Sequence, residues 1–489
     1  MNYPLGPSCF REPVLQRPII LRLTTPILAC LAVLWAGAGN ALHGQSAESD
    51  LADILTSWSQ GNQPALTRGE AEAVYRDVVE TISQQVVKTR ELPLKHAVET
   101  RLMSDPEVVG WVETQREKLI GDEDEALADG LASKALGVIP EDTDVLLLMR
   151  MRTVPPIAGF YDPESKFLSV LTKTDPLSPF GQQVLAHEIT HALQDQHFDL
   201  NAMVYETDGL NADTKLARRA VVEGDAELSE NEWQEAFGRS MAMAGGGRSA
   251  LAESSLPADM WLAPEFRTFK ASAPPSMGVT SYFPYSAGLE FMAHLKQENF
   301  PFWRMLPFRV PPQSTEQILH PEKYYPRMEA PRPVSAPSWP EGRHGLTERY
   351  RDTWGEWGIR LTLSLPGEVN QALLPEAMRG NSAAFRGAAG WGGDEMMLAH
   401  DEKREAWVLA WATVWDSEDD AAEFLEMLER RFRSLSAFEK LWSAGRPMPA
   451  DGETAVWSGE GRTLRLRRAG DAVDVWMATD PVYFDALEQ

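Results

Sequence analysis

Cysteine is scarce in this chain. Its 489 residues include only two cysteines, Cys9 and Cys30, and both fall in residues 1–41. These residues have the features of a signal peptide, because three arginines precede a short apolar run that small residues follow. A mature chain beginning near Leu42, as we expect, has no cysteine and forms neither disulfides nor thiolate sites. Any metal must then be held by histidine, aspartate or glutamate.

Long apolar runs are also lacking. The run at residues 27–38 is too short to span a bilayer comfortably, although an uncleaved anchor beginning near Ile19 is the alternative. No later stretch is apolar enough to cross a membrane, so we expect no stable membrane insertion after signal cleavage. The sequence therefore predicts an exported protein, located in the periplasm or the extracellular medium.

Basic residues are outnumbered. The chain has 46 lysines and arginines against 72 acidic residues, which gives a formal net charge of -26 at pH 7. A charge of this sign argues against nucleic acid as a partner and against anionic membrane surfaces. The hydrophobic content of 43% is that of a globular protein with substantial cores rather than of a disordered chain.

The remaining sequence divides into four regions, and the fold class that we predict is α+β. Residues 48–150 have mostly helical periodicity with one alternating stretch, and residues 151–325 contain the motif described below. The prolines in residues 326–344 indicate a linker. Residues 345–489 are predicted to form a separate C-terminal α+β domain, because alternating strand patterns predominate there.

Two local patterns in these regions are specific. Residues 157–173 have the pattern of two short strands around an Asp162-Pro163 turn, and Ser178-Pro179 then has the pattern of a helix start. In the C-terminal region, residues 407–415 alternate as a strand with tryptophan on one face. Ser417 is predicted to cap a helix that packs its apolar side chains on that strand.

Histidine is also uncommon, with nine in the chain, yet two lie four residues apart in the stretch AHEITHALQDQHFDL. On a helix, His187 and His191 lie one turn apart on the same face, so both can bind one ion. Glu188 lies beside that face, where its carboxylate reaches a water on the metal rather than the metal itself. The pattern predicts a metal site with Glu188 as its general base.

This stretch resembles the zinc helix of the gluzincin metallopeptidases, the clan that includes thermolysin. The resemblance covers about residues 157 to 230 and implies a zincin-like core that binds Zn²⁺. It implies a third zinc ligand in an EGxA pattern on the next helix, which Glu223 of Glu-Gly-Asp-Ala matches. Glu227 lies on the same helical face and is a rival ligand. The glycine after Glu223 is unfavourable in a helix, by about 1 kcal/mol relative to alanine, and indicates a close approach of the two helices.

The resemblance implies two further roles. The clan has an acidic residue one turn after the second histidine, where this chain has Asp195, and we expect it to steady a zinc-binding histidine. His197 is expected to be a loop histidine. The clan also supplies a histidine or tyrosine that donates to the developing oxyanion, and His320 is our tentative choice, with Tyr324 and Tyr325 as alternatives.

These observations predict an exported zinc metallopeptidase that acts on a peptide or protein substrate. Bound zinc lowers the pKa of a water ligand toward about 7, and Glu188 takes the proton. The segment from Gly159 to Tyr161 is expected to be a strand edge that pairs with an extended peptide. The alternative function is an inactive exported scaffold that binds proteins through the tryptophan-rich C-terminal domain.

Overall fold

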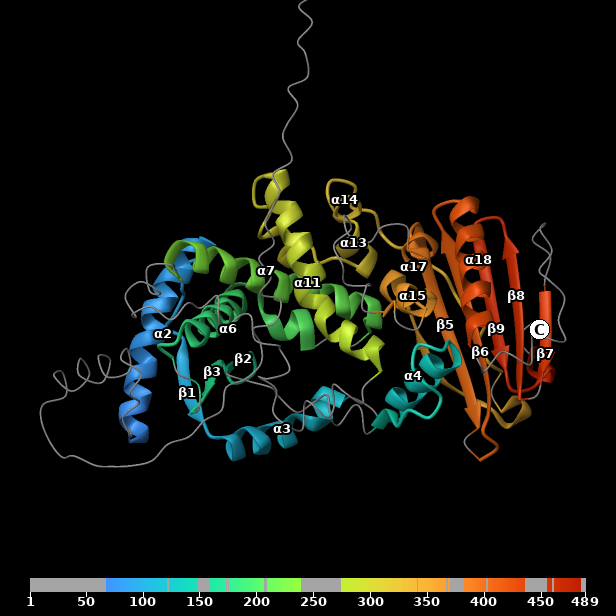
Figure 1. The fold of residues 1–489 in the computed structure, drawn as a ribbon, viewed down its shortest axis with the longest axis horizontal. Coiled ribbons are helices and arrows are strands. Elements are labelled where there is room, and N and C mark those ends of the chain that lie inside the picture. The colour runs from blue at the N-terminus through green and yellow to red at the C-terminus, as the bar shows by residue number, and fades with distance from the viewer. Residues whose placement is uncertain are drawn as a thin grey trace, which may run out of the picture.

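The computed structural model describes the chain from residue 67 to residue 484 with gaps. The described residues are 67–120, 123–146, 159–172, 174, 176–205, 209–238, 274–340, 342–365, 368–369, 382–401, 403–435, 455–459 and 461–484. The predicted signal peptide and its cleavage near Leu42 lie outside them. Within them the chain is α+β as predicted, with helices and two separate sheets (Figure 1).

The first sheet is small and mixed. It has the strand order β1-β3-β2, and its strands are β1 (Glu99–Met103), β2 (Gly159–Asp162) and β3 (Phe167–Leu171). Strand β1 runs parallel to β3, whereas β2 and β3 form the hairpin predicted around the Asp162-Pro163 turn. Strand β2 lies at the edge of this sheet, beside the helix that carries the motif.

The motif lies in one of four long helices, and capping side chains set where three of them begin. They are α2 (Arg68–Arg90), α6 (Pro179–Phe198), α7 (Ala212–Trp233) and α11 (Pro275–Glu298). The side chain of Ser178 accepts the N–H of Gly181 and starts α6 as predicted, with Pro179 as the first helical residue. Asn211 caps α7 in the same way. Asp199, in the left-handed region with φ of 54°, ends α6.

Helix α6 packs one face on the small sheet and on α2. Leu185, Ile189 and Leu193 are at most 1% exposed and form the apolar stripe of this face. The other face of α6 meets α7, which in turn packs against α11. Glycines allow the backbones of α7 and α11 to approach closely where these helices cross. A Cβ atom added at Gly224 would lie 2.1 Å from the backbone of Gly288. The prediction of a close approach between α6 and α7 at Gly224 is wrong, because the helix that Gly224 meets closely is α11.

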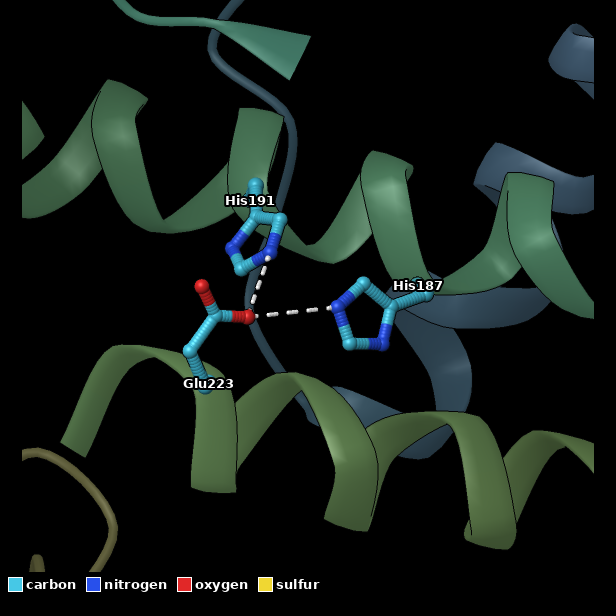
Figure 2. A group of neighbouring side chains, drawn as sticks. All are labelled: His187, His191 and Glu223. Atoms are coloured by element: carbon cyan, nitrogen blue, oxygen red, sulfur yellow. Dashed lines mark ion pairs between the residues drawn. The ribbon is translucent and has the colours of Figure 1, made fainter. Parts of the chain in front are cut away.

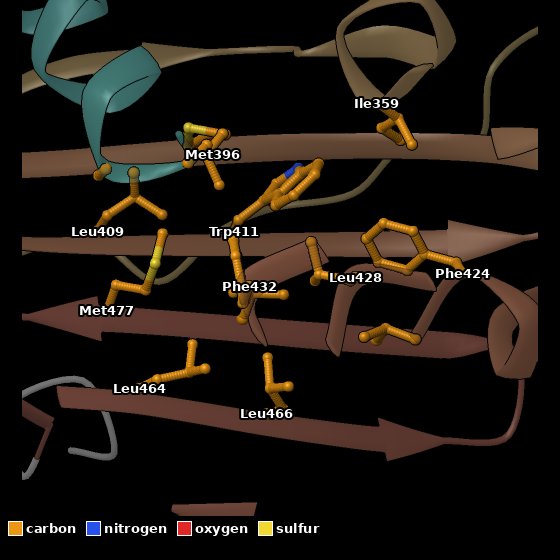
Figure 3. Close-up of a cluster of buried hydrophobic side chains, with 14 of the residues drawn as sticks. Ile359, Met396, Leu409, Trp411, Phe424, Leu428, Phe432, Leu464, Leu466 and Met477 are labelled. Carbon is orange, nitrogen blue, oxygen red and sulfur yellow. The ribbon is translucent and has the colours of Figure 1, made fainter. Parts of the chain in front are cut away.

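The second sheet is antiparallel and has six strands in the order β4-β5-β6-β9-β8-β7 (Figure 1). Its strands are β4 (Thr347–Asp352), β5 (Trp391–Asp401), β6 (Ala406–Trp415), β7 (Ala455–Gly459), β8 (Arg462–Ala469) and β9 (Ala472–Ala478). Ser417 caps α18 (Glu418–Ser434) as predicted. The apolar side chains of α18 lie on the sheet, among them Phe424, Leu428 and Phe432 against Trp411 (Figure 3).

Shorter helices complete the fold, and two of them link the six-stranded sheet to the rest of the molecule. They are α3 (Asp105–Ile120), α4 (Glu123–Ala135), α12 (Leu306–Arg309), α13 (Thr315–Leu319), α14 (Pro321–Tyr324), α15 (Gly355–Leu363) and α17 (Ala383–Ala388). Alanines of α4 belong to the core of the six-stranded sheet. Conversely, Trp357 and Leu361 of α15 belong to the core formed by α7 and α11.

The proline-rich segment lies on the six-stranded sheet. Arg332 donates its backbone N–H to the carbonyl of Gly392, and Ala336 and Trp339 are buried against the face of β5 and β6 opposite α18. The predicted boundary at residues 326–344 therefore does not separate the hydrophobic cores, because each part contributes side chains to the core of the other. Among the described residues, no helix combines the length and apolarity needed to cross a membrane.

Candidate metal centre

Three of the predicted residues converge between α6 and α7. Figure 2 shows the imidazoles of His187 and His191 and the carboxylate of Glu223 pointing toward one another. One oxygen of Glu223, Oε2, lies 3.5 Å from Nε2 of His187 and 3.4 Å from Nε2 of His191. The two rings are nearly perpendicular, with centroids 4.8 Å apart. The spacing of two histidines by one helical turn thus places both Nε2 atoms opposite one carboxylate.

These distances fit a tetrahedral zinc ion. Two ligands that each lie about 2.0–2.1 Å from such an ion are about 3.4 Å from one another. Oε2 of Glu223 is buried and has no hydrogen-bond partner among the described residues, although a buried carboxylate oxygen without one is costly. A cation between the three side chains would satisfy it. The side chains of His191 and Glu223 are each 12% exposed, so solvent reaches the site.

The remaining nitrogen of each histidine faces an acceptor. Nδ1 of His187 lies 3.1 Å from Oε2 of Glu230, and Nδ1 of His191 lies 2.9 Å from Oε1 of Gln194. A hydrogen on Nδ1 leaves the lone pair of Nε2 free to bind a metal. Sequence reasoning did not identify either partner. Glu230 lies about one turn beyond the EGxA pattern, and the Gln194 side chain was not weighed.

The clustered histidines and carboxylates shift one another's pKa values. Burial lowers the pKa of His187, but the carboxylates of Glu223 and Glu230 outweigh it and raise this pKa well above its ordinary value. Burial also lowers the pKa of His191, but the carboxylate of Glu223 outweighs this effect and raises the pKa above its ordinary value. Burial also raises the pKa of Glu223, but the two histidines reverse this effect and hold its pKa far below the ordinary value. The carboxylate of Glu223 is therefore ionised.

Glu188 is held beside the cluster by the edge strand. Its Oε2 accepts the backbone N–H of Tyr161 in β2, 2.8 Å away. Burial raises the pKa of Glu188, while the neighbouring His191 and His187 lower it in part. One carboxylate oxygen is thus fixed, and the raised pKa suits a group that takes up a proton near neutral pH. The N–H of Tyr161 is engaged by Glu188, so this position of the edge does not pair with a peptide.

The rival ligand Glu227 lies on the other side of His187. Its Oε1 is 3.9 Å from Nδ1 of His187, and together with Glu230 it forms a second group of potential ligand atoms. Burial and the nearby Glu230 raise the pKa of Glu227 to about 8. Glu223 is the carboxylate that faces both histidines, whereas Glu227 faces only the nitrogen that also meets Glu230.

Asp195 is not brought to either histidine. Its Oδ2 accepts hydrogen bonds from the hydroxyl of Tyr161 at 2.7 Å and from Nζ of Lys166 at 2.8 Å, and its Oδ1 accepts the backbone N–H of Leu200. The expected contact with a zinc-binding histidine is made instead by the preceding residue, Gln194. Asp195 anchors β2 and the end of α6. Nε2 of His197 lies 2.8 Å from the carbonyl of Pro93, away from the cluster. His197 was predicted to lie in a loop, but it belongs to the last turn of α6.

The structure directs the candidate oxyanion donors elsewhere. Nε2 of His320 lies 3.0 Å from Oε1 of Glu356 and 3.3 Å from Nη2 of Arg360, both in α15. The hydroxyl of Tyr324 donates to the carbonyl of Val310 at 2.7 Å. The ring of Tyr325 stacks on Phe300, with centroids 3.7 Å apart. None of these contacts involves the three clustered side chains.

Tyr285 is the aromatic residue that the structure places at the cluster. Its ring stacks on His187 with a centroid distance of 6.3 Å and an interplanar angle of 28°. It lies in α11, directly after the internal Pro284. The candidates for the oxyanion donor in the sequence were His320, Tyr324 and Tyr325, and Tyr285 was not considered.

A family model matches the C-terminal part of the chain. Residues 344–488 match the model of a domain of unknown function, DUF8575, which is less than half of the chain. No curated protein matches the chain. Among solved structures, the chain resembles a protein from Chloroflexus aurantiacus that is provisionally described as a hydrolase with a novel fold. The identity is 16% and the TM-score 0.32, over 57% of this chain and 96% of that one. A likeness at this level establishes neither a shared fold nor a shared activity.

Proposed function

We propose that this chain is a zinc-dependent peptidase, a hydrolase that binds one zinc ion through His187, His191 and Glu223. The observation that carries the proposal is the position of Oε2 of Glu223. It lies 3.4–3.5 Å from both Nε2 atoms and lacks a hydrogen-bond partner among the described residues. Two nitrogens and one carboxylate oxygen form the donor set of many catalytic zinc sites, which keep a position open for water.

A zinc ion bound there supplies Lewis acidity, which lowers the pKa of a water ligand toward about 7 and polarises a substrate carbonyl. Glu188 accepts the proton of the attacking water, because its Oε2 is held by Tyr161 and its pKa is raised by burial. The same carboxyl group then donates that proton to the nitrogen of the leaving amine as the C–N bond breaks. The carboxyl group thus returns to its ionised state at the end of each cycle.

Tyr285 is the side chain that we assign to the developing oxyanion. Its ring lies against His187, and α11 is a rigid element held to α7 by the Gly224–Gly288 crossing. A phenol hydroxyl near the reacting carbonyl stabilises the negative charge that forms on its oxygen. His320 is not favoured for this role, because its imidazole is paired with Glu356.

The substrate that we propose is an extended peptide or an unfolded protein, taken up outside the cytoplasm. Strand β2 lies at the sheet edge next to the cluster, which supports pairing with a peptide at positions other than Tyr161. The signal-like N-terminal sequence supports an exported location. The net charge of -26 makes basic peptides the better substrates on electrostatic grounds.

The alternative of a tryptophan-rich binding scaffold has less support. Four tryptophans of the C-terminal domain lie inside the core of the six-stranded sheet, where they are at most 1% exposed: Trp391, Trp411, Trp415 and Trp457. Side chains buried in this way stabilise the domain and do not form a surface for a partner.

The test is peptide hydrolysis by the purified full chain. We expect cleavage of an unfolded protein substrate that a zinc chelator abolishes and that added zinc restores. The matched control is Glu188→Gln, which preserves the shape of the side chain but cannot accept the proton. Cleavage that resists the chelator, or that the Glu188→Gln protein retains at the wild-type rate, would show that a contaminant or another site is responsible.

A further inference from the structure

Asp225, Arg90 and Arg304 form a buried ion cluster that is linked to His191 through Gln194. We infer that Gln194 positions the His191 imidazole for metal binding, and that Asp225, held between Arg90 and Arg304, fixes Gln194. This inference deepens the proposed function and rests on the zinc site assigned there.

The orientation of the Gln194 amide is determined by its neighbours. Its Nε2 lies 3.0 Å from the backbone carbonyl of Val222 and 2.9 Å from Oδ2 of Asp225. A carbonyl and an ionised carboxylate only accept hydrogen bonds, so the group between them must be the donating NH₂. The amide oxygen Oε1 must therefore face His191, where it lies 2.9 Å from Nδ1.

This orientation determines the state of the imidazole. An amide oxygen accepts a hydrogen bond and cannot donate one, so Nδ1 of His191 must carry the hydrogen. Nε2, the nitrogen that faces Glu223, is then the atom with the free lone pair in the neutral ring. Gln194 thereby selects the tautomer that binds a metal and fixes the rotation of the ring.

Asp225 is itself fixed by two guanidinium groups from different parts of the chain. Nε of Arg90 in α2 lies 2.9 Å from its Oδ2, and Nε of Arg304, after α11, lies 2.7 Å from its Oδ1. Arg304 also donates to Glu232 and to the hydroxyl of Ser229. The side chain of Asp225 is fully buried and that of Arg90 is 2% exposed.

The composition of this cluster favours a positioning role over a purely stabilising one. Its two guanidiniums face the carboxylates of Asp225 and Glu232, and the ammonium of Lys296 also pairs with Glu232. Buried ion clusters add little net stability in comparison with apolar packing, because desolvation of the charges offsets their attraction. The cluster does, however, hold an acceptor for the Gln194 amide in one place. Four segments that are distant in sequence thereby determine the geometry of one metal ligand.

The test compares zinc affinity among isosteric variants of the full chain. Gln194→Met keeps the size of the side chain but removes the acceptor for His191. Loss of such a partner costs about 10- to 100-fold in metal affinity, so we expect the zinc Kd to rise by that factor in a chelator competition. The matched control is Gln182→Met in the same helix. Gln182 is also buried, but it donates to the carbonyl of Leu177, far along the helix from His191.

A measurement on the wild-type protein keeps the inference testable if Gln194→Met folds poorly. The ¹⁵N NMR shifts of the neutral His191 imidazole in the metal-free protein report which ring nitrogen carries the hydrogen. We expect the hydrogen on Nδ1, which faces the amide oxygen of Gln194.

Unchanged zinc affinity in Gln194→Met would overturn the inference, and so would an equal loss in Gln182→Met or a neutral His191 that carries its hydrogen on Nε2. In these cases a wild-type protein that binds zinc leaves the proposed function standing. A folded wild-type protein that binds no zinc would instead overturn both the proposed function and this inference.

Discussion

Replacement of Gly224 by alanine tests how the helix crossing supports the metal site. Gly224 follows the ligand Glu223 in α7 and faces Gly288 of α11. An added Cβ atom would lie 2.1 Å from the carbonyl carbon and 2.3 Å from the carbonyl oxygen of Gly288. These are backbone atoms, so no change of rotamer can relieve the overlap. The helices must move apart by about 1 Å to reach ordinary van der Waals contact.

The expected cost has two opposing parts. Overpacking of a well-packed interface costs about 1–3 kcal/mol, and a backbone overlap belongs near the upper value. Alanine in place of glycine recovers about 1 kcal/mol through its helix propensity. We therefore expect a net loss of about 2 kcal/mol in the free energy of unfolding. A shift of about 1 Å at Glu223 also exceeds the tolerance of about 0.2 Å for metal ligands, so zinc should bind at least tenfold more weakly.

Denaturant titration and chelator competition measure these two effects. The matched control is Gly278→Ala in α11, where an added Cβ meets nothing within 4 Å. That variant should be as stable as the wild type or up to about 1 kcal/mol more stable, with an unchanged zinc Kd. If Gly224→Ala unfolds at the wild-type denaturant concentration and binds zinc normally, the crossing is not the reason for a glycine at this position.

Three further changes separate chemistry from structure. Glu188→Gln should retain zinc while peptide hydrolysis falls by about 10²–10⁴-fold, and turnover within a few-fold of wild type would remove its role as the base. Tyr285→Phe should keep the metal and lower kcat by about 10²–10³-fold; an unchanged kcat would assign the oxyanion to another donor. His320→Gln should leave zinc content and kcat unchanged, but lower stability in a pH-dependent way. Glu356 raises the pKa of His320. The hydrogen bond of the charged His320–Glu356 pair should therefore stabilise the folded protein by about 1.5–3 kcal/mol. This stabilisation is fully present below pH 6.5, the pKa of His320 in the unfolded chain, and is lost as the pH rises through the pKa in the folded protein. Denaturant titrations at pH 6 and pH 9 measure it, and a difference from wild type that grows toward pH 9 would contradict the pairing with Glu356.

Local patterns in the sequence predicted much of the site. The spacing of His187 and His191 requires only that the segment be helical, and the Ser178-Pro179 start made that helix predictable. The EGxA match located Glu223, which the structure places opposite both histidines. The hairpin around Asp162 and the packing of α18 on β6 also follow from short-range periodicity.

Features that depend on contacts between distant segments were not predictable in this way. Tyr285 was not considered, because no sequence spacing connects it with His187 and only the packing of α11 on α7 brings its ring there. Asp195 and Gln194 both lie about one turn after His191 on α6, and their partners on other elements decide which of them meets it. Tyr161 and Lys166 hold Asp195, whereas Val222 and Asp225 of α7 hold Gln194. The sequence pattern contains no record of these pairings, which arise from the tertiary packing.

The zinc content of the purified full chain tests the central claim most directly. The account predicts one zinc ion per chain by mass spectrometry of the metal, a near-complete loss in Glu223→Ala, and retention in Glu227→Ala, which removes a neighbouring carboxylate from the same helical face. A wild-type protein without zinc would contradict the account. So would a Glu223→Ala protein that keeps its zinc while Glu227→Ala loses it, because the metal would then lie on the other side of His187.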